Sequence, residues 1–494
     1  MLKQAFFKTI LLLVPFYLLS IAVLAQEKYW LEFNPDNLSV KKNDIQLLKD
    51  SLKKQFPEDL TFHYQSKWNP VVSISTKEKN VSPLTEYGFV KSITVQKELQ
   101  PLSIKTLTPI EYSYALEQIK AHFIIDSMEL SGKGVKIGVI DGGFMDADAE
   151  PSLQHLIKKK QIKFFQDYLL KGNNDPFYGK RISQDDHGTQ VLRMIAGSDN
   201  GTSIKYGMAE NAEFYLARTD HGIRERRIEE EYWVAAIELF YEMGIRLVNS
   251  SLGYTDGYDK RKENHSRKEV DGKSSMITKT AQLAAEKGML IVSAAGNDGH
   301  NNWGILSLPS DAKDVLTVGA ARYDDWSKIY YSSIGPQKLD YIKPDVVCFA
   351  ANGTSFSAPV ITGLAACIWE YDSTLSNIEV MNIIKSGSHL AENPNNYIGY
   401  GVPDSEKIVS ILIREKTKSI FKSINTDQDY IELEIPNGIE IVIIFHKENS
   451  RNVVEQQTIK IDERQTKLKI EKTDKAKLTT IVAQDKLILE VNWK

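Results

Sequence analysis

Three short apolar runs in the middle of the chain each end in small or polar residues, and this pattern restricts the fold more than any other. The runs are VKIGVID (135–141), RLVNSS (246–251) and LIVSAAGN (290–297). Such continuously apolar, β-branched runs are typical of strands that are buried on both faces of a parallel sheet. Because open parallel sheets carry their active sites at the carboxyl ends of the strands, the residues that end these runs are candidates for a functional site.

A fourth segment, NGTSFSAP at 352–359, places a serine just before a helix. Pro359 is tolerated in the first helical turn, where its missing N–H would be unpaired in any case, and the apolar residues that follow recur at helical spacing. Ser355 therefore lies at the positive end of a helix dipole, where developing negative charge is favoured. Taken alone, the segment is more typical of a serine that only caps a buried helix.

A hydroxyl nucleophile needs a base, and two of the nine histidines are followed by glycine. His187 opens HGTQVLRMIAG, whose apolar residues share one helical face, so its ring is expected at a buried helix start. His221 lies in HGIRERRIEEE, a charged segment that is typical of a solvated surface. His187 is therefore the candidate base.

The base needs an acid to orient it, and Asp141 at the end of the first apolar run is the candidate. An aspartate in this place could also cap the next turn. Asp185 and Asp186 are rival acids, although neighbouring acids on one loop more often serve as solvated charge or as loop anchors.

Two further segments end in residues that suit the same chemistry. The amide of Asn297 can donate a hydrogen bond to an oxyanion, although asparagine before Asp-Gly is also a common turn residue. Ser251, Leu252 and Gly253 follow the second run and offer an edge that can pair with an extended peptide.

The order Asp141, His187, Asn297, Ser355, with the motifs VIDGGF, HGTQV, SAAGND and NGTSFSAP, resembles that of the subtilisin-like serine proteases. The similarity covers residues 114–411. It implies a subtilisin-like three-layer α/β/α domain with a mostly parallel central sheet. It also implies a serine endopeptidase in which Ser355 attacks the scissile carbonyl and His187 transfers the proton. Asp141 would orient the histidine, and Asn297 would help to hold the oxyanion.

The resemblance assigns substrate binding to two segments with small, uncharged side chains. Because the walls of the specificity pocket are small and uncharged, an apolar side chain is expected before the scissile bond. The residues that would bind substrate and line this pocket are Ser251, Leu252, Gly253, Ala294, Ala295 and Gly296.

Three features depart from the family pattern. Residues 190–193 replace the His-Val-Ala-Gly that usually follows HGT. Only CFAAN at 348–352 joins KPDVV to the serine motif, which would reshape the far wall of the pocket. A charged insertion at 256–273 is expected to form a flexible lip.

The first 25 residues predict a signal peptide. Lys3 and Lys8 precede an apolar run, and Ala25 with Val23 marks the expected cleavage site. An uncleaved membrane anchor is the alternative, but the run is short for a bilayer span. We therefore expect an exported protein, either secreted, periplasmic or at the cell surface, without a transmembrane anchor after cleavage.

Cleavage would remove two positive charges from a chain of net charge −4, leaving −6. This small, mixed charge gives no reason to expect nucleic acid or an anionic membrane surface as partner. We expect a monomer that acts on polypeptides and needs no cofactor for its chemistry. A structural calcium ion, which many relatives bind, is not identifiable from the sequence. The acids at 229–231 are interpreted as the solvated start of a helix, because calcium ligands come from curved loops.

Residues 26–110 alternate strand-like runs with a helical stretch at 45–56. The resemblance makes them an α+β propeptide that assists folding and acts as an intramolecular inhibitor until it is removed. Self-cleavage is expected between Val95 and Tyr112. A permanent N-terminal domain with another role is the alternative.

Residues 111–412 would form the catalytic domain, and residues 413–494 a C-terminal β-sandwich-like domain. The second assignment rests on short alternating strands. A hairpin is predicted around Pro436, Asn437 and Gly438. The role of this domain cannot be read from its sequence.

Cys348 and Cys367 lie in apolar segments of the catalytic domain. An exported chain permits a disulfide, but cysteines in such places behave as small apolar residues, so we expect two buried thiols. Their spacing, without nearby histidines, makes no zinc site. The functional alternative to a protease is a binding or scaffolding protein with a dormant site, although none of the four site residues is missing.

Overall fold

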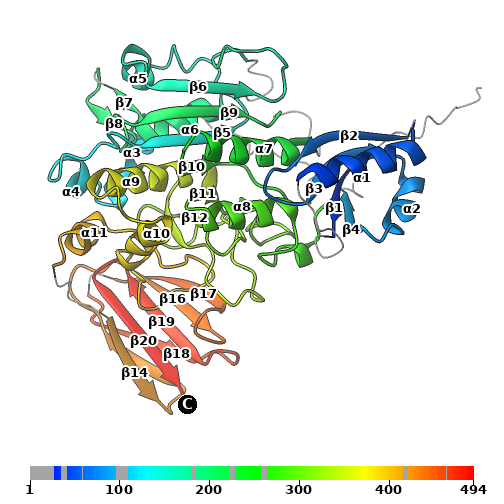
Figure 1. The fold of residues 1–494 in the computed structure, drawn as a ribbon. Helices are drawn as coiled ribbons and strands as arrows, with labels where there is room; N and C mark the ends of the chain where they lie inside the picture. The colour runs from blue at the N-terminus through cyan, green and yellow to red at the C-terminus, as the bar shows by residue number, and fades with distance from the viewer. Residues whose placement is uncertain are drawn as a thin grey trace, which may run out of the picture.

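The computed structural model describes residues 27–34, 42–57, 59–95, 109–179, 185–199, 201–221, 228–256, 264–415, 421–462 and 464–494. The predicted signal peptide and most of the expected cleavage region lie outside these ranges. Within them the chain forms an N-terminal module, a central domain and a C-terminal pair of sheets, and Figure 1 shows the first and last of these on different sides of the central domain. In the same ranges, no helix combines the length and apolar character needed to cross a bilayer.

The central domain contains, among the described residues, a seven-stranded sheet in which every neighbouring pair is parallel. In spatial order its strands are β13 (Val346–Phe349), β12 (Leu316–Ala321), β11 (Leu290–Ala294), β10 (Leu247–Ser250), β5 (Lys136–Asp141), β9 (Glu213–Arg218) and β6 (Ile162–Asp167). Successive side chains of a strand point to opposite faces. Thus Ile137 and Val139 of β5 lie in one apolar core, and Ile140 lies in the other.

Helices cover both faces of this sheet. Residues of α6 (His187–Ala196), α9 (Ala358–Tyr371) and α10 (Asn377–Ser386) form the first core, and those of α7 (Ile228–Glu242) and α8 (Met276–Glu286) form the second. The predicted three-layer α/β/α fold with a parallel central sheet is therefore confirmed. Smaller elements complete the domain: α3 (Pro109–Gln118), α4 (His122–Ile125), α5 (Gln154–Lys158), β7 (Ser198–Asp199), β8 (Ile204–Lys205) and α11 (Ser405–Leu412).

The N-terminal module is a four-stranded antiparallel sheet in the order β2-β3-β1-β4 with two helices, again counting described residues. Leu31, Leu52 and Val72 belong to its own apolar core, whereas Trp30 and Val71 point into the core beneath α7 and α8. Figure 1 shows the module, in blue, beside these two helices. Its elements are β1 (Glu27–Phe33), α1 (Lys42–Gln55), β2 (Leu60–Gln65), β3 (Val71–Thr76), α2 (Val81–Thr85) and β4 (Val90–Val95).

The acids at 229–231 are buried, so the prediction that they form a solvated helix start is wrong. The module covers Glu231, which accepts a hydrogen bond from Ser73 at 2.5 Å and lies 3.5 Å from the Lys28 ammonium. Glu230 lies 3.1 Å from the ring of His265. The buried His265 anchors the insertion that was predicted to be a flexible lip. That prediction is wrong for residues 264–273, and residues 257–263 lie outside the described ranges.

The C-terminal region contains a five-stranded sheet, β14-β20-β19-β16-β17, and a two-stranded sheet, β15-β18, in the residues described there. Apolar residues of both sheets share one core. The strands are β14 (Phe421–Thr426), β15 (Tyr430–Glu434), β16 (Ile441–Lys447), β17 (Val453–Lys460), β18 (Lys467–Glu471), β19 (Leu478–Ala483) and β20 (Leu487–Trp493).

The predicted hairpin around Pro436 is wrong. β15 pairs with β18, whereas β16 pairs with β17 and β19. Ile435 and Ile439, on either side of the turn, are both buried in the core between the two sheets. Burial of these side chains directs the chain from one sheet to the other instead of back along the same sheet.

Cys348 and Cys367 are free thiols, and both are buried. Burial raises the pKa of each thiol above its ordinary value. The expectation of two buried, unlinked thiols is confirmed.

Candidate active site

The four candidate residues come together at the carboxyl edge of the central sheet. Asp141 ends β5, and Asn297 follows β11, two strands away in the sheet order. His187 is the first residue of α6, and Ser355 lies in a short 3₁₀ turn just before α9. Each side chain thus comes from the end of a strand or the start of a helix at this edge of the sheet.

A hydrogen bond of 2.7 Å joins Asp141 Oδ1 to His187 Nδ1, and both residues are buried. The amide of Gly142 donates to the same carboxylate oxygen at 2.8 Å. An ionised carboxylate at Nδ1 holds the proton there and leaves Nε2 as the acceptor. Burial by itself would lower the pKa of His187. The charge and hydrogen bond of Asp141, with smaller contributions from Asp220 and Asp186, outweigh burial and raise that pKa.

Ser355 exchanges two hydrogen bonds with Ser251. The hydroxyl of Ser355 donates to the Ser251 carbonyl at 3.1 Å, and the hydroxyl of Ser251 donates to the Ser355 carbonyl at 2.9 Å. The ring of Phe356 lies 5.6 Å from that of His187, centre to centre, which brings the serine turn against the base. Catalytic hydrogen bonds of this kind often form only when substrate is bound, so the present direction of the hydroxyl does not exclude proton transfer to His187.

Asn297 has one buried group without a partner, its side-chain amide Nδ2. The other end of this side chain is fixed, because its Oδ1 accepts from the amide of Thr354 at 2.8 Å and from the hydroxyl of Thr354 at 3.0 Å. Gly353 has a φ of 146°, and a Cβ atom added to it would lie 3.1 Å from Nδ2 of Asn297. The serine turn therefore orients an unpaired donor next to Ser355.

The residues assigned to substrate binding also meet at one place. The hydroxyl of Ser307 lies close to both segments. A Cβ atom added to Gly253 would be 2.2 Å from this hydroxyl oxygen, and one added to Gly296 would be 2.7 Å from it. Ala294 and Ala295 are almost fully buried. Ser307 was not identified from the sequence, because no local pattern relates it to either segment.

The rival candidates have other partners. Asp185 lies 2.7 Å from the guanidinium of the buried Arg218, and Asp186 is the residue before α6. The backbone amide of His221 donates to Glu229 at 3.1 Å.

The short connection before the serine motif is held by Tyr331. The phenol donates to the carbonyl of Ala350 and accepts from the amide of Gly353 at 3.0 Å. A buried side chain from another loop thus fixes the serine turn that the sequence showed to have a shortened lead-in. The sequence gives no signal for this contact.

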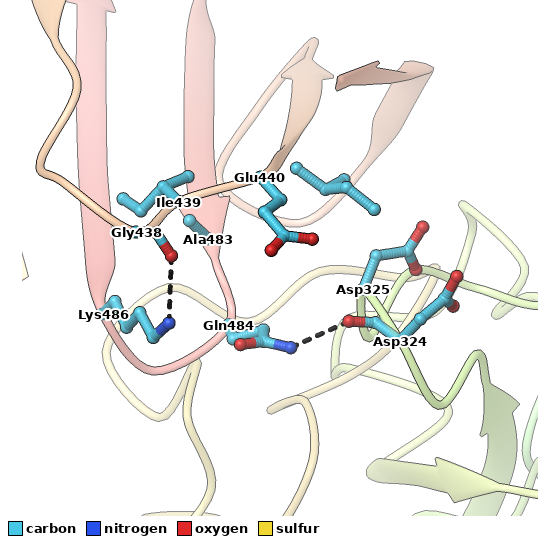
Figure 2. A pocket seen from close by; sticks show the side chains of 9 residues that line it. Asp324, Asp325, Gly438, Ile439, Glu440, Ala483, Gln484 and Lys486 are labelled. Atoms are coloured by element: carbon cyan, nitrogen blue, oxygen red, sulfur yellow. Dashed lines mark hydrogen bonds between the residues drawn. The ribbon is translucent and has the colours of Figure 1, made fainter. Parts of the chain in front are cut away.

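A pocket of about 350 Å³ lies away from these residues, between the central domain and the C-terminal sheets (Figure 2). Its acids are engaged locally, since Asp324 pairs with Arg322 at 2.9 Å and Asp325 accepts from Ser327. Within the described ranges, no cluster of three or more His, Cys, Asp or Glu side chains could hold a metal ion. The pocket is lined by Asp324, Asp325, Gly438, Ile439, Glu440, Ile441, Ala483, Gln484 and Lys486.

The sequence is similar to those of known proteases. It is 23% identical over 399 residues to the alkaline protease of Alkalihalobacillus alcalophilus, and this alignment covers 77% of this chain and 91% of that protein. It is 25% identical over 283 residues to subtilisin DY of Bacillus licheniformis, covering 55% of this chain and 90% of that protein.

Two solved structures share the fold. The epidermin leader peptide processing serine protease from Staphylococcus aureus aligns with a TM-score of 0.56 at 17% identity, over 80% of this chain and all of that one. Fervidolysin from Fervidobacterium pennivorans, a keratinolytic enzyme related to subtilisin, aligns with a TM-score of 0.57 at 15% identity, over 92% of this chain and 70% of that one. The model of the subtilase family matches residues 132–401, more than half of the chain, and on this match the chain belongs to the subtilase family of serine endopeptidases.

Proposed function

We propose that this subtilase hydrolyses peptide bonds with Ser355 as nucleophile, His187 as general base and Asp141 as the acid that orients it. The observation that carries the proposal is the buried 2.7 Å hydrogen bond between Asp141 and His187 beside an unpaired amide of Asn297. The bond supplies a base with a fixed tautomer, and the amide supplies a donor for negative charge.

In the acylation step, Ser355 Oγ attacks the scissile carbonyl while its proton passes to His187 Nε2. The carbonyl oxygen becomes an oxyanion, which the Asn297 amide and the Ser355 backbone N–H hold. When the C–N bond breaks, His187 returns the proton to the leaving amine, and water repeats the sequence to release the acyl group. The raised pKa of His187 makes the neutral imidazole a stronger base. It also means that a higher pH is needed to deprotonate the ring.

For the substrate, we propose that an extended peptide pairs with the edge at Ser251, Leu252 and Gly253. The side chain before the cut would enter the space bounded by these residues and by Ala294, Ala295 and Gly296. The small, uncharged walls favour an apolar side chain there. The Ser251 carbonyl accepts a hydrogen bond from the Ser355 hydroxyl. When this hydroxyl turns towards His187, the carbonyl becomes free to accept a hydrogen bond from the substrate backbone.

The finer organisation is also proposed. Residues 1–25 would be a signal peptide that leads to export, residues 26–110 a self-cleaved propeptide, residues 111–412 the catalytic domain and residues 413–494 a permanent C-terminal domain. The N-terminal module supports the propeptide assignment, because it folds around its own core and covers α7 and α8. We propose a monomeric, exported enzyme whose propeptide inhibits it.

Labelling of the purified protein by a fluorophosphonate probe, with casein cleavage in parallel, tests the mechanism. Ser355→Ala should abolish labelling and also leave the chain unprocessed. His187→Ala should lower activity to near the background. His221→Ala is the matched control and should retain labelling, since the hydrogen bond of His221 runs from its backbone amide to Glu229 and not to the serine turn. A wild-type protein that is neither labelled nor processed would refute the proposal and favour a dormant site.

A further inference from the structure

A third acid, Asp220, lies beside the pair of Asp141 and His187. In the parallel register of β5 and β9, Asp141 is opposite Arg218, and Asp220 comes two residues later. The amide of the intervening Thr219 donates to the backbone carbonyl of Asp141 at 3.1 Å. This pairing continues the sheet past Asp141 and brings Asp220 to the same edge, where it is only 3% exposed.

Asp141 and Asp220 each have a carboxylate oxygen, Oδ2, that is buried without a hydrogen-bond partner. The other oxygen of Asp141 already accepts from His187 and Gly142. A buried anionic oxygen without a donor is unfavourable. Burial and the charge of Asp141 therefore make Asp220 easier to accommodate with a proton than without one.

The nearest cation does not compensate Asp220 fully, because other acids use it. The Arg218 guanidinium lies 2.7 Å from Asp185 and 3.6 Å from Asp167, and its Nε donates to the carbonyl of Gly142 at 2.9 Å. Asp167 is further satisfied by Asn173 and two amides. Among the residues that the structure describes, acids therefore outnumber cations around this edge.

Two more acids come from neighbouring elements. Asp186 precedes α6 and is partly exposed, and Glu229, near the start of α7, accepts the amide of His221. Among the described residues, the cationic charges that act on Asp220 are Arg218 and, when it is protonated, His187.

We propose that Asp220 is a positioning residue of the catalytic centre, which shares buried negative charge with Asp141 and sets the pH at which His187 becomes an active base. The inference rests on the proposed mechanism. Burial, and next the charge of Asp141, raise the pKa of Asp220 to about 7, while His187 and Arg218 oppose the rise. Because the charges of Asp220 and His187 act on each other, the protonation of each group depends on that of the other. The ionised carboxylate favours the imidazolium that forms when His187 takes the proton of Ser355.

The titration of His187 can be measured without turnover. In Ser355→Ala protein with labelled histidine rings, NMR should show that Asp220→Asn lowers the midpoint of the His187 titration by about one pH unit, a tenfold change in the protonation equilibrium. Asp186→Asn removes a more exposed charge from the same region and should shift the midpoint less. Asp220→Glu should restore it.

Asp220→Leu is a second neutral variant, used in case Asp220→Asn disturbs the fold. Thermal unfolding shows whether each variant is folded. An unchanged midpoint in a folded neutral variant overturns the proposal. Because this titration does not require turnover, an inactive wild type would refute the proposed function without deciding the role of Asp220.

The second readout is the pH profile of kcat/KM in the enzyme with Ser355 intact. Asp220→Asn should move the acid limb to lower pH and reduce kcat at the plateau about tenfold, with KM unchanged. A changed KM with an unmoved acid limb would show that Asp220 contacts substrate instead, and would overturn the proposal.

Discussion

The N-terminal module and the C-terminal sheets pack on the same central domain through different chemistry. On the N-terminal side, Glu238 of α7 is 1% exposed and accepts hydrogen bonds from the hydroxyls of Tyr64 and Ser66 and, at 3.1 Å, from the amide of Lys67. The buried Glu231 is similarly covered. This interface thus buries acids of the central domain under donors of the module.

The C-terminal interface is mainly apolar. Side chains of the C-terminal sheets belong to the same core as α9 and the central sheet. Polar contacts lie at its margin. The Lys120 ammonium is 2.8 Å from Asp485 and 2.9 Å from Asp404, and the amide of Val453 donates to Asn396 at 2.9 Å. The apolar contributors from the C-terminal sheets are Ile443, Phe445, Val453, Val482 and Ile488.

The two interfaces should respond differently to pH. Burial of apolar area depends little on pH, so the C-terminal sheets should stay in place under all conditions in which the enzyme is folded. A buried carboxylate changes its protonation when it is covered or uncovered, so docking of the N-terminal module is linked to pH. The apolar C-terminal interface therefore suits a permanent part, and the N-terminal interface with its buried acids suits a part that is released, as the proposed self-cleavage requires.

The largest expected effect comes from Phe445→Ala, which should destabilise the C-terminal sheets and the central domain together by about 3–5 kcal/mol, because a large buried side chain leaves a cavity in their shared core. Thermal unfolding measures it. Trp30→Ala is the matched change on the N-terminal side and should weaken module docking while leaving the mature enzyme unaffected. A Phe445→Ala protein whose central domain unfolds at the wild-type temperature would break the comparison.

An intermediate effect is expected from pH. Burial raises the pKa of Glu238 to about 7 in the docked module, although the amides of Lys67 and Trp68 oppose the rise. A raised pKa means that docking is fully favourable below the ordinary pKa of 4.5 and weakens as pH rises to about 7, by on the order of a hundredfold. Undocking by urea of the Ser355→Ala protein, followed by tryptophan fluorescence at pH 5 and pH 8, measures this.

Glu238→Gln should remove that pH dependence, because the amide does not titrate. Glu242→Gln is its control, since the ion pair of Glu242 with Lys67 is about half exposed and should contribute little. Equal docking of the wild type at both pH values would show that Glu238 is not the group linked to release.

The smallest effect is expected from Lys120→Met, which keeps the apolar stem and removes the charge. Asp404 retains hydrogen bonds from the amides of Glu406 and Lys407, so the loss should be about 1 kcal/mol. A double-mutant cycle with Asp485→Asn isolates the interaction between the two parts. A coupling energy as large as the effect of Phe445→Ala would mean that charge, and not apolar packing, attaches the C-terminal sheets.

Much of the fold could be predicted because its signals are local. The run VKIGVID forms β5 up to Asp141, and HGTQVLRMIA forms α6 from His187, as their apolar patterns indicated. The hairpin around Pro436 failed for a physical reason. Alternation shows that a segment is a strand, but burial of Ile435 and Ile439 between two sheets decided which strand it pairs with.

The family, the parallel sheet and the order of Asp141, His187, Asn297 and Ser355 follow from the sequence, because each is marked by residues within a few positions of itself. Burial of Glu231 and Glu238, the contact of Tyr331 with the serine turn and the place of Asp220 beside Asp141 depend on the folded structure. Each of these depends on contacts between distant segments. Burial and electrostatic coupling arise from such contacts, and no local pattern records them.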